Sequence, residues 1–393
     1  MNAASLASRS PHVVVVGAGA FGGWTALELV RRGARVTLVD AWGPGNVRAS
    51  SGGETRVIRA TYGTQTIYSR LAVRALARWR AHDRQFGTKL LRLTGVLWMF
   101  QQTTPFAAAS IEAVRALDQP VEELSVPARR RRFPQIDFTG VESAFLEPEA
   151  GYLLARRACE HVVDRVVAEG GQYVPAAVAS PVRLGKAGTE IRLVDRTALS
   201  ADAFVFACGP WLGTLFPDVV GRRIMPTRQD VFYVGTPPGD PRFTDDGLPI
   251  WIDVGKRIMY GIPGNAHRGF KIADDTSGPR FDPTIGAREP ERASLRRARA
   301  FLARRFPSLA RAPLLGSEVC QYEATPDSDY IVDRHPGAPN AWIVGGGSGH
   351  GFKMGPVIGE VVASAVLGTD GPDPAFSLAR FGASGRRADQ KWT

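Results

Sequence analysis

The hydrophobic pattern near the N-terminus predicts a strand, a helix and a second strand. Four consecutive valines, Val13–Val16, are typical of a strand buried on both faces, as in the centre of a parallel sheet. After a glycine-rich turn, apolar residues recur at helical spacing from Trp24 to Val30. The second strand, Arg35–Val39, ends at Asp40. This order favours a doubly wound α/β domain built on a parallel sheet.

The chain continues with further helix and strand patterns of this kind. Helices are expected at 68–86, at 155–169 and from about Pro356, with a polar, helix-rich stretch at 101–134. Buried strands are expected at 95–100, 191–194, 203–211 and 341–344. The glycine- and serine-rich stretch 43–53 is expected to be a loop.

A different pattern begins at residue 222. Short alternating strands are expected at 230–234, 248–254, 257–262 and 269–273, followed by a charged helix at 289–306. Such alternation is typical of an antiparallel sheet with one covered face. The first pattern returns at residue 316, so two interleaved domains are expected. The fold class is α/β, with a Rossmann-type domain at 1–86, 150–221 and 316–393 and an antiparallel-sheet domain at 87–149 and 222–315.

The turn after the first strand carries the first candidate chemistry. Gly17, Gly19 and Gly22 form a G-x-G-x-x-G pattern. The first glycine allows the turn, the second lets a pyrophosphate approach the backbone, and the third lets the helix pack on the sheet. Asp40 stands where a carboxylate accepts hydrogen bonds from an adenosine ribose. The pattern also occurs in ordinary glycine-rich loops, but the flanking strand, helix and acid favour a dinucleotide site.

Length and composition narrow the class of protein. With 393 residues, 44% of them hydrophobic, the chain can form one large or two intertwined domains. Residues 1–12 lack the apolar core of a signal peptide, and the apolar stretch 357–367 is too short for a bilayer. We therefore expect a cytoplasmic protein with no membrane partner. Three cysteines, far apart, exclude a disulfide framework and do not suggest a zinc site.

The net charge of +11 raises the alternative of a nucleic-acid-binding protein. Of the 49 basic residues six are lysine, and the arginines are scattered along the chain instead of lining one stripe. The run Arg129–Arg132 is expected to be a solvated helix face. Nucleic acid is therefore not an expected partner.

Five further motifs follow the glycine pattern in order. They are Gly53-Glu54-Thr55-Arg56-x-x-Arg59, Tyr260-Gly261-x-Pro263, Lys271, Cys320-x-Tyr322 and Ser348-Gly349-His350-Gly351-Phe352-Lys353. Over nearly its whole length, the chain resembles the monomeric sarcosine oxidase and N-methyltryptophan oxidase family, within the D-amino-acid-oxidase superfamily of flavoproteins. The last two motifs are the most specific part of this resemblance.

The resemblance implies FAD, not NAD, so the two domains are expected to be an FAD-binding domain and a substrate-binding domain. It implies oxidation of the C–N bond of an amino acid or N-alkyl amino acid to an imine, with O2 reduced to H2O2. The expected partners are an amino acid substrate and O2, and a monomer is expected. Two alternatives are a flavin-dependent amino acid dehydrogenase of the same fold with another electron acceptor, and a nicotinamide dehydrogenase. The chemistry of a nicotinamide dehydrogenase does not require the Cys320 and Lys353 motifs.

The resemblance implies a set of cofactor-binding residues. They are Gly17, Gly19, Gly22, Asp40, Ser50, Thr55, Arg56, Val178, Cys320, Gly349, Gly351 and Lys353. Cys320 is implied to hold the flavin covalently, through a thioether to its 8-methyl carbon. From the sequence alone, the alternative for Cys320 is a small buried apolar residue. Cys159 is expected on a helix and Cys208 in a core strand.

The resemblance also implies a substrate site. Arg59 and Lys353 are implied to hold the substrate carboxylate, which suits the planar donor fork of an arginine. Arg56 is implied beside the flavin as a catalytic residue. From the sequence alone, the alternative for both arginines is a solvated surface position.

The resemblance places Lys271 above the flavin ring, where oxygen reacts, and implies that it is a catalytic residue. Tyr260 is implied as a second catalytic residue, which also lines the substrate cavity. In a strand, Phe270 and Ile272 share one face and Lys271 points to the other. If those two residues pack inward, the alternative is a solvent-facing lysine.

Two positions depart from the family pattern. Gly52 and Asp275 stand where sarcosine oxidase has histidines that line the active site. The cavity therefore differs in shape and charge. Asp275, taken as a substrate-binding residue, is expected to favour a substrate with a second cation or hydrogen-bond donor. His350 is expected only to satisfy the backbone of its own loop.

Overall fold

The valine run forms the centre of a six-stranded sheet in the computed structural model of the protein, which describes residues 10–184 and 190–382. β1 (His12–Val16) lies between β2 (Arg35–Asp40) and β12 (Ala203–Phe206) and is parallel to both. The sheet order is β18-β19-β12-β1-β2-β9, where β18 is Ile331–His335, β19 is Ala338–Gly345 and β9 is Gln172–Pro175. Of the stretch considered for a signal peptide, residues 1–9 lie outside the described residues.

Both faces of this sheet are buried, as the valine run predicts. Val13 and Val15 face one hydrophobic cluster and Val14 and Val16 face another. The first cluster lies under three helices, α1 (Ala20–Arg31), α5 (Ala155–Ala168) and α9 (Gly355–Leu367). The second lies under the hairpin β10 (Glu190–Arg192) and β11 (Ala198–Ser200) and the short helices α6 (Leu212–Leu215) and α7 (Pro217–Val220).

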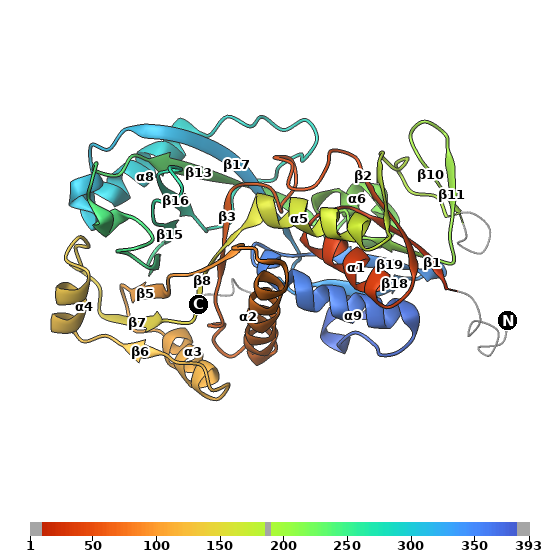
Figure 1. The fold of residues 1–393 in the computed structure, drawn as a ribbon. Coiled ribbons are helices and arrows are strands. Elements are labelled where there is room, and N and C mark those ends of the chain that lie inside the picture. Colours follow the sequence, from red (N-terminus) through yellow and green to blue (C-terminus); the bar gives the residue numbers. More distant parts are fainter. Residues whose placement is uncertain (1–9, 185–189, 383–393) are drawn as a thin grey trace.

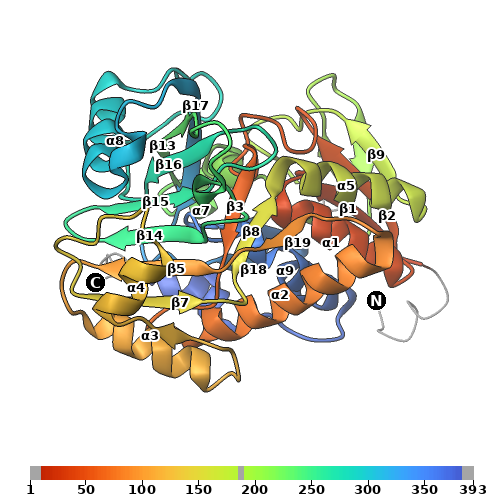
Figure 2. The ribbon, with the colours of Figure 1, turned by 60° about the vertical axis from the view of Figure 1, so that its left-hand side comes forward.

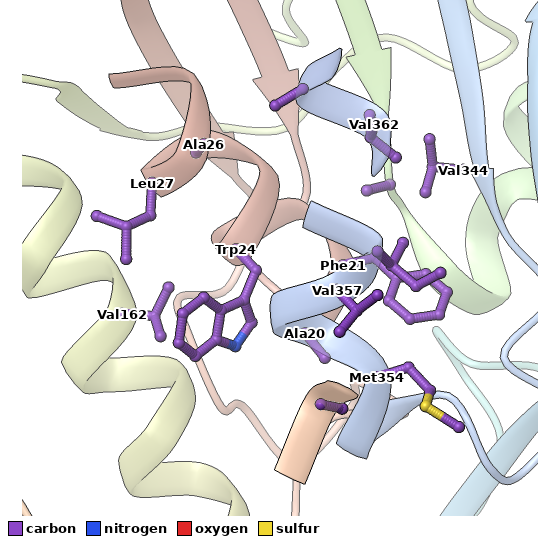
Figure 3. Packing of buried hydrophobic residues seen from close by; sticks show 14 of the residues in the cluster. Ala20, Phe21, Trp24, Ala26, Leu27, Val162, Val344, Met354, Val357 and Val362 are labelled. Carbon is purple, nitrogen blue, oxygen red and sulfur yellow. The ribbon is translucent and has the colours of Figure 1, made fainter. Parts of the chain in front are cut away.

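Close packing holds α1 against α9. Figure 3 shows Trp24 of α1 beside Val162 of α5 and next to α9. Gly355 and Gly359 of α9 make room for it, because a Cβ added at either position would lie 2.5 or 2.7 Å from an atom of Trp24. The N-terminal end of α1 is thereby fixed against the first turn of α9, with the glycine turn after β1 beside both.

An eight-stranded sheet forms the other half of the molecule (Figure 1). Its order is β17 (Leu314–Ala324), β13 (Met225–Val234), β16 (Phe270–Asp274), β15 (Ile258–Ile262), β14 (Ile250–Val254), β5 (Val96–Phe100), β7 (Ser143–Glu147) and β6 (Glu122–Glu123). The strands are antiparallel except for the parallel pair β14–β5. Helix α8 (Arg292–Arg305) covers one face, and α3 (Pro105–Arg115) covers part of the other. Both faces are thus covered, not one.

A small three-stranded sheet lies between the two large ones (Figures 1 and 2). It has the order β3 (Thr55–Ile58), β8 (Gly151–Leu154) and β4 (Leu91–Leu93). The long helix α2 (Thr66–Phe86) follows β3, and α4 (Val126–Arg132) lies near β6. Because β3 carries the Arg56 and Arg59 motif, this motif is placed between the two halves of the molecule.

Three details differ from the expectations. Arg129 is buried and donates to the Val141 carbonyl, so only Arg130–Arg132 form the expected solvated face. Cys208 follows β12 instead of lying within it, and it lines a groove. Residues 191–194 contribute to the separate hairpin, not to the six-stranded sheet. In each case the environment depends on a pairing that the local hydrophobic pattern does not show.

The domain division stays a prediction, but one of its boundaries moves. β17 pairs with β13 along its whole length, from Leu314 to Ala324, within the eight-stranded sheet. The boundary expected at residue 316 therefore falls inside a strand of the second domain, and the chain returns to the first domain only after β17. Within the described ranges, no helix combines the length and the apolar character that a membrane crossing requires.

Candidate active site

A groove of about 310 Å³ runs along the carboxyl ends of β1, β2 and β12. Ligands of open α/β sheets bind in this position. Its lining includes these predicted cofactor-binding residues: Gly17, Gly19, Asp40, Ser50, Arg56, Val178, Gly349 and Gly351. Thr55, Gly22, Cys320 and Lys353 lie outside this lining, although the last two line the neighbouring cavity.

The glycine turn is as tight as its pattern predicts. Gly17 has a φ of +105°, a conformation that glycine adopts without strain. A Cβ added at Gly22 would lie 1.8 Å from the Gly17 carbonyl oxygen. Gly22 therefore serves the packing of α1 on the sheet and does not itself face the groove, while Gly17 and Gly19 leave the backbone accessible to a phosphate.

Asp40 ties the glycine turn to the following loop. Its Oδ2 accepts from the Ala18 N–H at 2.7 Å, and its Oδ1 accepts from the Trp42 and Gly43 N–H groups at 2.9 and 2.8 Å. Burial raises the pKa of this carboxyl, and the three backbone donors oppose that shift. Its contact with a ribose stays a prediction.

The polar atoms of the groove are suited to binding FAD. The Ser50 hydroxyl and the Glu323 Oε2 are buried and have no hydrogen-bond partner within the described part of the chain, and both residues line the groove. The N-terminal end of α1 opens onto the same space and favours negative charge. Phosphate, ribityl and adenine groups of a dinucleotide supply the partners that such atoms lack.

A second cavity, of about 120 Å³, adjoins the groove. Arg56, Tyr322, Gly349 and Phe352 line both spaces. The cavity collects these predicted residues: Arg56, Arg59, Tyr260, Lys271, Asp275, Cys320 and Lys353. They come from β3 and the residue after it, from three strands of the eight-stranded sheet or their ends, and from the segment before α9.

Arg59 and Lys353 are both buried beside one aromatic ring. The Arg59 guanidinium lies 4.4 Å and the Lys353 ammonium nitrogen 5.4 Å from the centre of the Tyr62 ring. Arg59 donates to the Thr61 carbonyl and also lies 5.1 Å from the Trp98 ring, and Lys353 donates to the His350 carbonyl at 3.0 Å. The surface alternative for Arg59 is therefore excluded. Two buried cations beside one ring are suited to hold an anion, and their contact with a substrate carboxylate stays a prediction.

The segment that carries Arg59 is held by a buried carboxylate. Glu147 accepts from the Ala60 N–H at 2.8 Å, from the Trp98 indole N–H at 2.8 Å and from the Thr61 hydroxyl. The sequence does not identify Glu147, Tyr62 or Trp98 as part of the site. Only the structure shows that a buried acid lies near two aromatic residues here, and this combination is common in protein cores.

Lys271 faces the cavity and not solvent. Only 2% of its surface is exposed, and its ammonium group donates to the Thr55 carbonyl at 3.0 Å. Phe270 and Ile272 pack on the opposite face of β16, in the cluster under α8. Burial, assisted by the nearby Arg56, lowers the pKa of Lys271 to about 8.

Arg56 brings a positive charge to Cys320. Its Nη2 lies 3.2 Å from the Cys320 Sγ, and its guanidinium also donates to the carbonyls of Ser50, Gly52 and Thr55. Burial dominates at the other two cysteines: it raises the pKa of Cys159 to about 12, although Arg56 opposes that shift, and it likewise raises the pKa of Cys208. Cys320 is half-buried at the junction of cavity and groove.

Asp275 lies on the side of the cavity formed by the eight-stranded sheet. It accepts from the Tyr322 hydroxyl. Burial raises the pKa of Asp275 to about 6, against the opposing effects of Tyr322, Arg59 and Lys353. The His350 ring bonds to the Tyr330 hydroxyl at 2.8 Å and to the Ser328 carbonyl at 3.1 Å, and His350 lines the cavity. These bonds reach another segment, whereas the sequence predicts that His350 satisfies only the backbone of its own loop.

Comparisons with known proteins agree on one family. Residues 12–365 match the family described as FAD dependent oxidoreductase. The chain is 29% identical over 361 residues to monomeric sarcosine oxidase of Bacillus sp. (strain B-0618), covering 90% of this chain and 92% of that protein. It is 28% identical over 376 residues to N-methyl-L-tryptophan oxidase of Yersinia pestis (strain Pestoides F), covering 94% and 99%.

Two solved structures share the fold. L-proline dehydrogenase from P. horikoshii superposes with a TM-score of 0.83 at 20% identity, over 96% of this chain and all of that one. Amadoriase I from Aspergillus fumigatus, a fructosyl amine:oxygen oxidoreductase, superposes with a TM-score of 0.78 at 21% identity, over 94% and 89%. At these identities the likeness concerns the fold.

Proposed function

The chain belongs to the FAD-dependent oxidoreductase family, and on this premise we propose that it oxidises the C–N bond of an amino acid or N-alkyl amino acid to an imine. The substrate loses two electrons and two protons, and O2 takes them up to give H2O2. The imine then hydrolyses in water. The relatives named sarcosine oxidase and N-methyl-L-tryptophan oxidase support this reaction class.

One observation carries the proposal: Arg59 and Lys353 are buried around Tyr62 in a cavity that opens onto the cofactor groove. A carboxylate placed between them receives charge-assisted hydrogen bonds in a site from which water is largely excluded. This anchor fixes the orientation of the substrate, so that its C–N bond faces the junction with the groove. FAD bound in the groove supplies the acceptor for the two electrons and passes them to O2.

The side chains around the junction prepare the substrate and the oxygen reaction. The substrate nitrogen must be neutral when it reacts, and the cations Arg56 and Lys271 disfavour a protonated amine beside them. Lys271 places a positive charge where negative charge develops on oxygen, which supports an oxidase over a dehydrogenase of the same fold. Measuring peroxide formed per substrate oxidised, with and without an artificial acceptor, separates these two functions. We also propose a monomer, since one chain forms both the groove and the cavity.

Replacing Arg59 or Lys353 by methionine is expected to raise KM for the amino acid by about 10²-fold or more. Removing a charge-assisted hydrogen bond from a buried site costs on the order of 2–4 kcal/mol. Steady-state kinetics of the two variants measure this change in KM. The control is Arg131→Met, at an exposed arginine outside both the groove and the cavity. The control is expected to behave as wild type. If decarboxylated analogues are oxidised by the wild type as well as amino acids are, the carboxylate anchor is wrong.

Replacing Asp275 by histidine is expected to shift the substrate preference toward small N-methyl amino acids, on the order of tenfold in relative kcat/KM. The reason is that Asp275 is ionised above a pH of about 6 and attracts a second cation or donor on the substrate. The Asp275→Asn variant keeps the size and removes the charge, so it is expected to lose substrates with a second cation selectively. An unchanged substrate profile in both variants contradicts this role.

A further inference from the structure

Strand β17 separates the cofactor groove from the substrate cavity, and its side chains alternate between them. Cys320 lines the cavity, Tyr322 lies at the junction, and Gln321 and Glu323 line the groove. The period of a strand explains this division, because successive side chains point to opposite faces. Of the two groove residues, Gln321 bonds to Arg48 and Arg288. Glu323 has a different environment.

Glu323 is a buried acid in the lining of the groove, and one of its two oxygens has no hydrogen-bond partner within the described residues. It is 8% exposed, and its Oε1 accepts from the Gly347 N–H at 3.1 Å. Its Oε2 is buried without a hydrogen-bond partner within the described part of the chain. No ion pair to a lysine or arginine of those residues satisfies it. A buried carboxylate with neither a cation nor a second donor is a costly state.

Two glycines pack against the carboxyl group. A Cβ added at Gly209 would lie 2.8 Å from Oε2, and one added at Gly347 would lie 2.9 Å from Oε1. Both glycines line the groove together with Glu323 and with Gly17 of the phosphate turn. A larger residue at either position would clash with the acid. At these two positions no side chain therefore comes between the carboxyl group and a ligand bound in the groove.

We propose that Glu323 binds the cofactor as a neutral carboxylic acid, donating a hydrogen bond from Oε2 to an oxygen of the polar section of FAD between its flavin and its adenine. In this arrangement Oε1 accepts from Gly347 and the Oε2–H donates to the ligand, so both oxygens are satisfied. An ionised Glu323 would instead face the negative charges of the diphosphate in a site of low polarity. FAD binding therefore takes up a proton at Glu323 whenever that acid is ionised in the free protein.

The charged groups around the groove are consistent with this assignment. Burial raises the pKa of Glu323 to about 7, and the bond from Gly347 opposes the shift only in part. The titratable groups that share the groove are Asp40, Arg56, Cys208 and Tyr322, and burial raises the pKa of Cys208 and Tyr322 far above neutrality. The neighbouring cavity adds Lys271 and Asp275, whose pKa values lie at about 8 and about 6. The contribution of these groups to the pH dependence of FAD binding must be separated from that of Glu323.

The test measures FAD binding, so its result is independent of the substrate. Apoprotein of the Cys320→Ala variant is titrated with FAD between pH 6 and pH 8.5, and the quenching of FAD fluorescence gives the Kd. The Kd is expected to rise by about tenfold or more over this range, because each pH unit above the pKa of the free acid weakens binding by up to tenfold. The double variant Cys320→Ala/Glu323→Gln has a permanently neutral donor of the same shape at this position. Its Kd for FAD is therefore expected to lose most of the pH dependence.

A matched control uses Asp275, the acid of the neighbouring cavity. Asp275→Asn in the same background is expected to keep the pH dependence, since Asp275 lines the cavity and not the groove. An equal slope with and without Glu323→Gln overturns the proposal, as does a Kd that does not change with pH. Calorimetry in buffers of different ionisation enthalpy counts the protons taken up on binding and needs no Glu323 variant. At pH 7.5, most of one proton is expected to be taken up per FAD bound. If no proton is taken up, the proposal is overturned.

Discussion

Replacing Lys271 by methionine is expected to slow the reoxidation of the reduced enzyme by O2 by about 10²- to 10³-fold, while anaerobic reduction by the substrate stays nearly unchanged. The ammonium group is buried in the cavity beside the junction with the groove, and it donates a hydrogen bond to the Thr55 carbonyl. A fixed charge in such a site stabilises the negative charge that oxygen acquires with its first electron, far more than a charge in water does. Stopped-flow absorbance of the two half-reactions measures both rates.

The pH dependence of reoxidation gives the same prediction a second check. With a pKa of about 8, Lys271 is cationic below that pH and loses its charge above it. The wild-type rate is therefore expected to be high below pH 8 and to fall as the pH rises through 8, and the Lys271→Met variant is expected to lack this step. Lys256→Met, at an exposed lysine, serves as the control. Equal losses in both half-reactions would make Lys271 a structural or substrate-binding residue instead.

Denaturing the wild-type protein in acid is expected to leave all the flavin in the pellet, and Cys320→Ala is expected to release all of it to the supernatant. We propose that Cys320, whose Sγ lies 3.2 Å from the Arg56 Nη2 at the junction of cavity and groove, would form the thioether with the flavin 8-methyl carbon. Forming the thioether breaks one C–H and one S–H bond and releases two electrons and two protons, for which O2 is the terminal acceptor. The denatured mass is expected to exceed that of the chain by one FAD.

Cys208→Ala is the matched control for this experiment. Cys208 also lines the groove, but its thiol bonds to the Val16 carbonyl and burial raises its pKa. Flavin is expected to stay in the pellet for this variant. If the wild-type protein itself releases its flavin on denaturation, Cys320 is a packing residue and the covalent attachment is wrong.

The sequence predicts those parts of the fold that depend on local pattern. The valine run, the glycine turn and the strands β5, β13, β14, β15 and β16 of the second sheet occur within a few residues of their expected positions, because each is determined by its own periodicity. The sequence does not predict the strands β6, β7 and β17 of that sheet. For Lys271 the strand period correctly separates it from Phe270 and Ile272. It could not decide between solvent and cavity, since that depends on β3 and on the loop before α9, which are far away in the chain.

Features that depend on neighbours outside the local pattern are not predicted. Arg129 is buried because Val141 and Phe138 lie over it, which an arginine run does not indicate. Glu323 stands in a strand among polar residues, and nothing local marks its second oxygen as unpartnered. The roles of Arg59, Lys353 and Cys320 came from the resemblance to a family, and the structure adds the rings and carbonyls that hold the first two in place.

The central position of β1 has a consequence for how the protein is made. The β1 residue His12 bonds to Asp202, 190 positions further along the chain, and the groove also needs the loop after β19. At a synthesis rate of about 5–20 residues per second, roughly 10–40 s pass before β12 can join β1. During this time one edge of a highly apolar strand stays unpaired, which invites aggregation. Efficient production is therefore expected to depend on chaperones that bind the nascent chain, and FAD is expected to be incorporated only after translation is nearly complete.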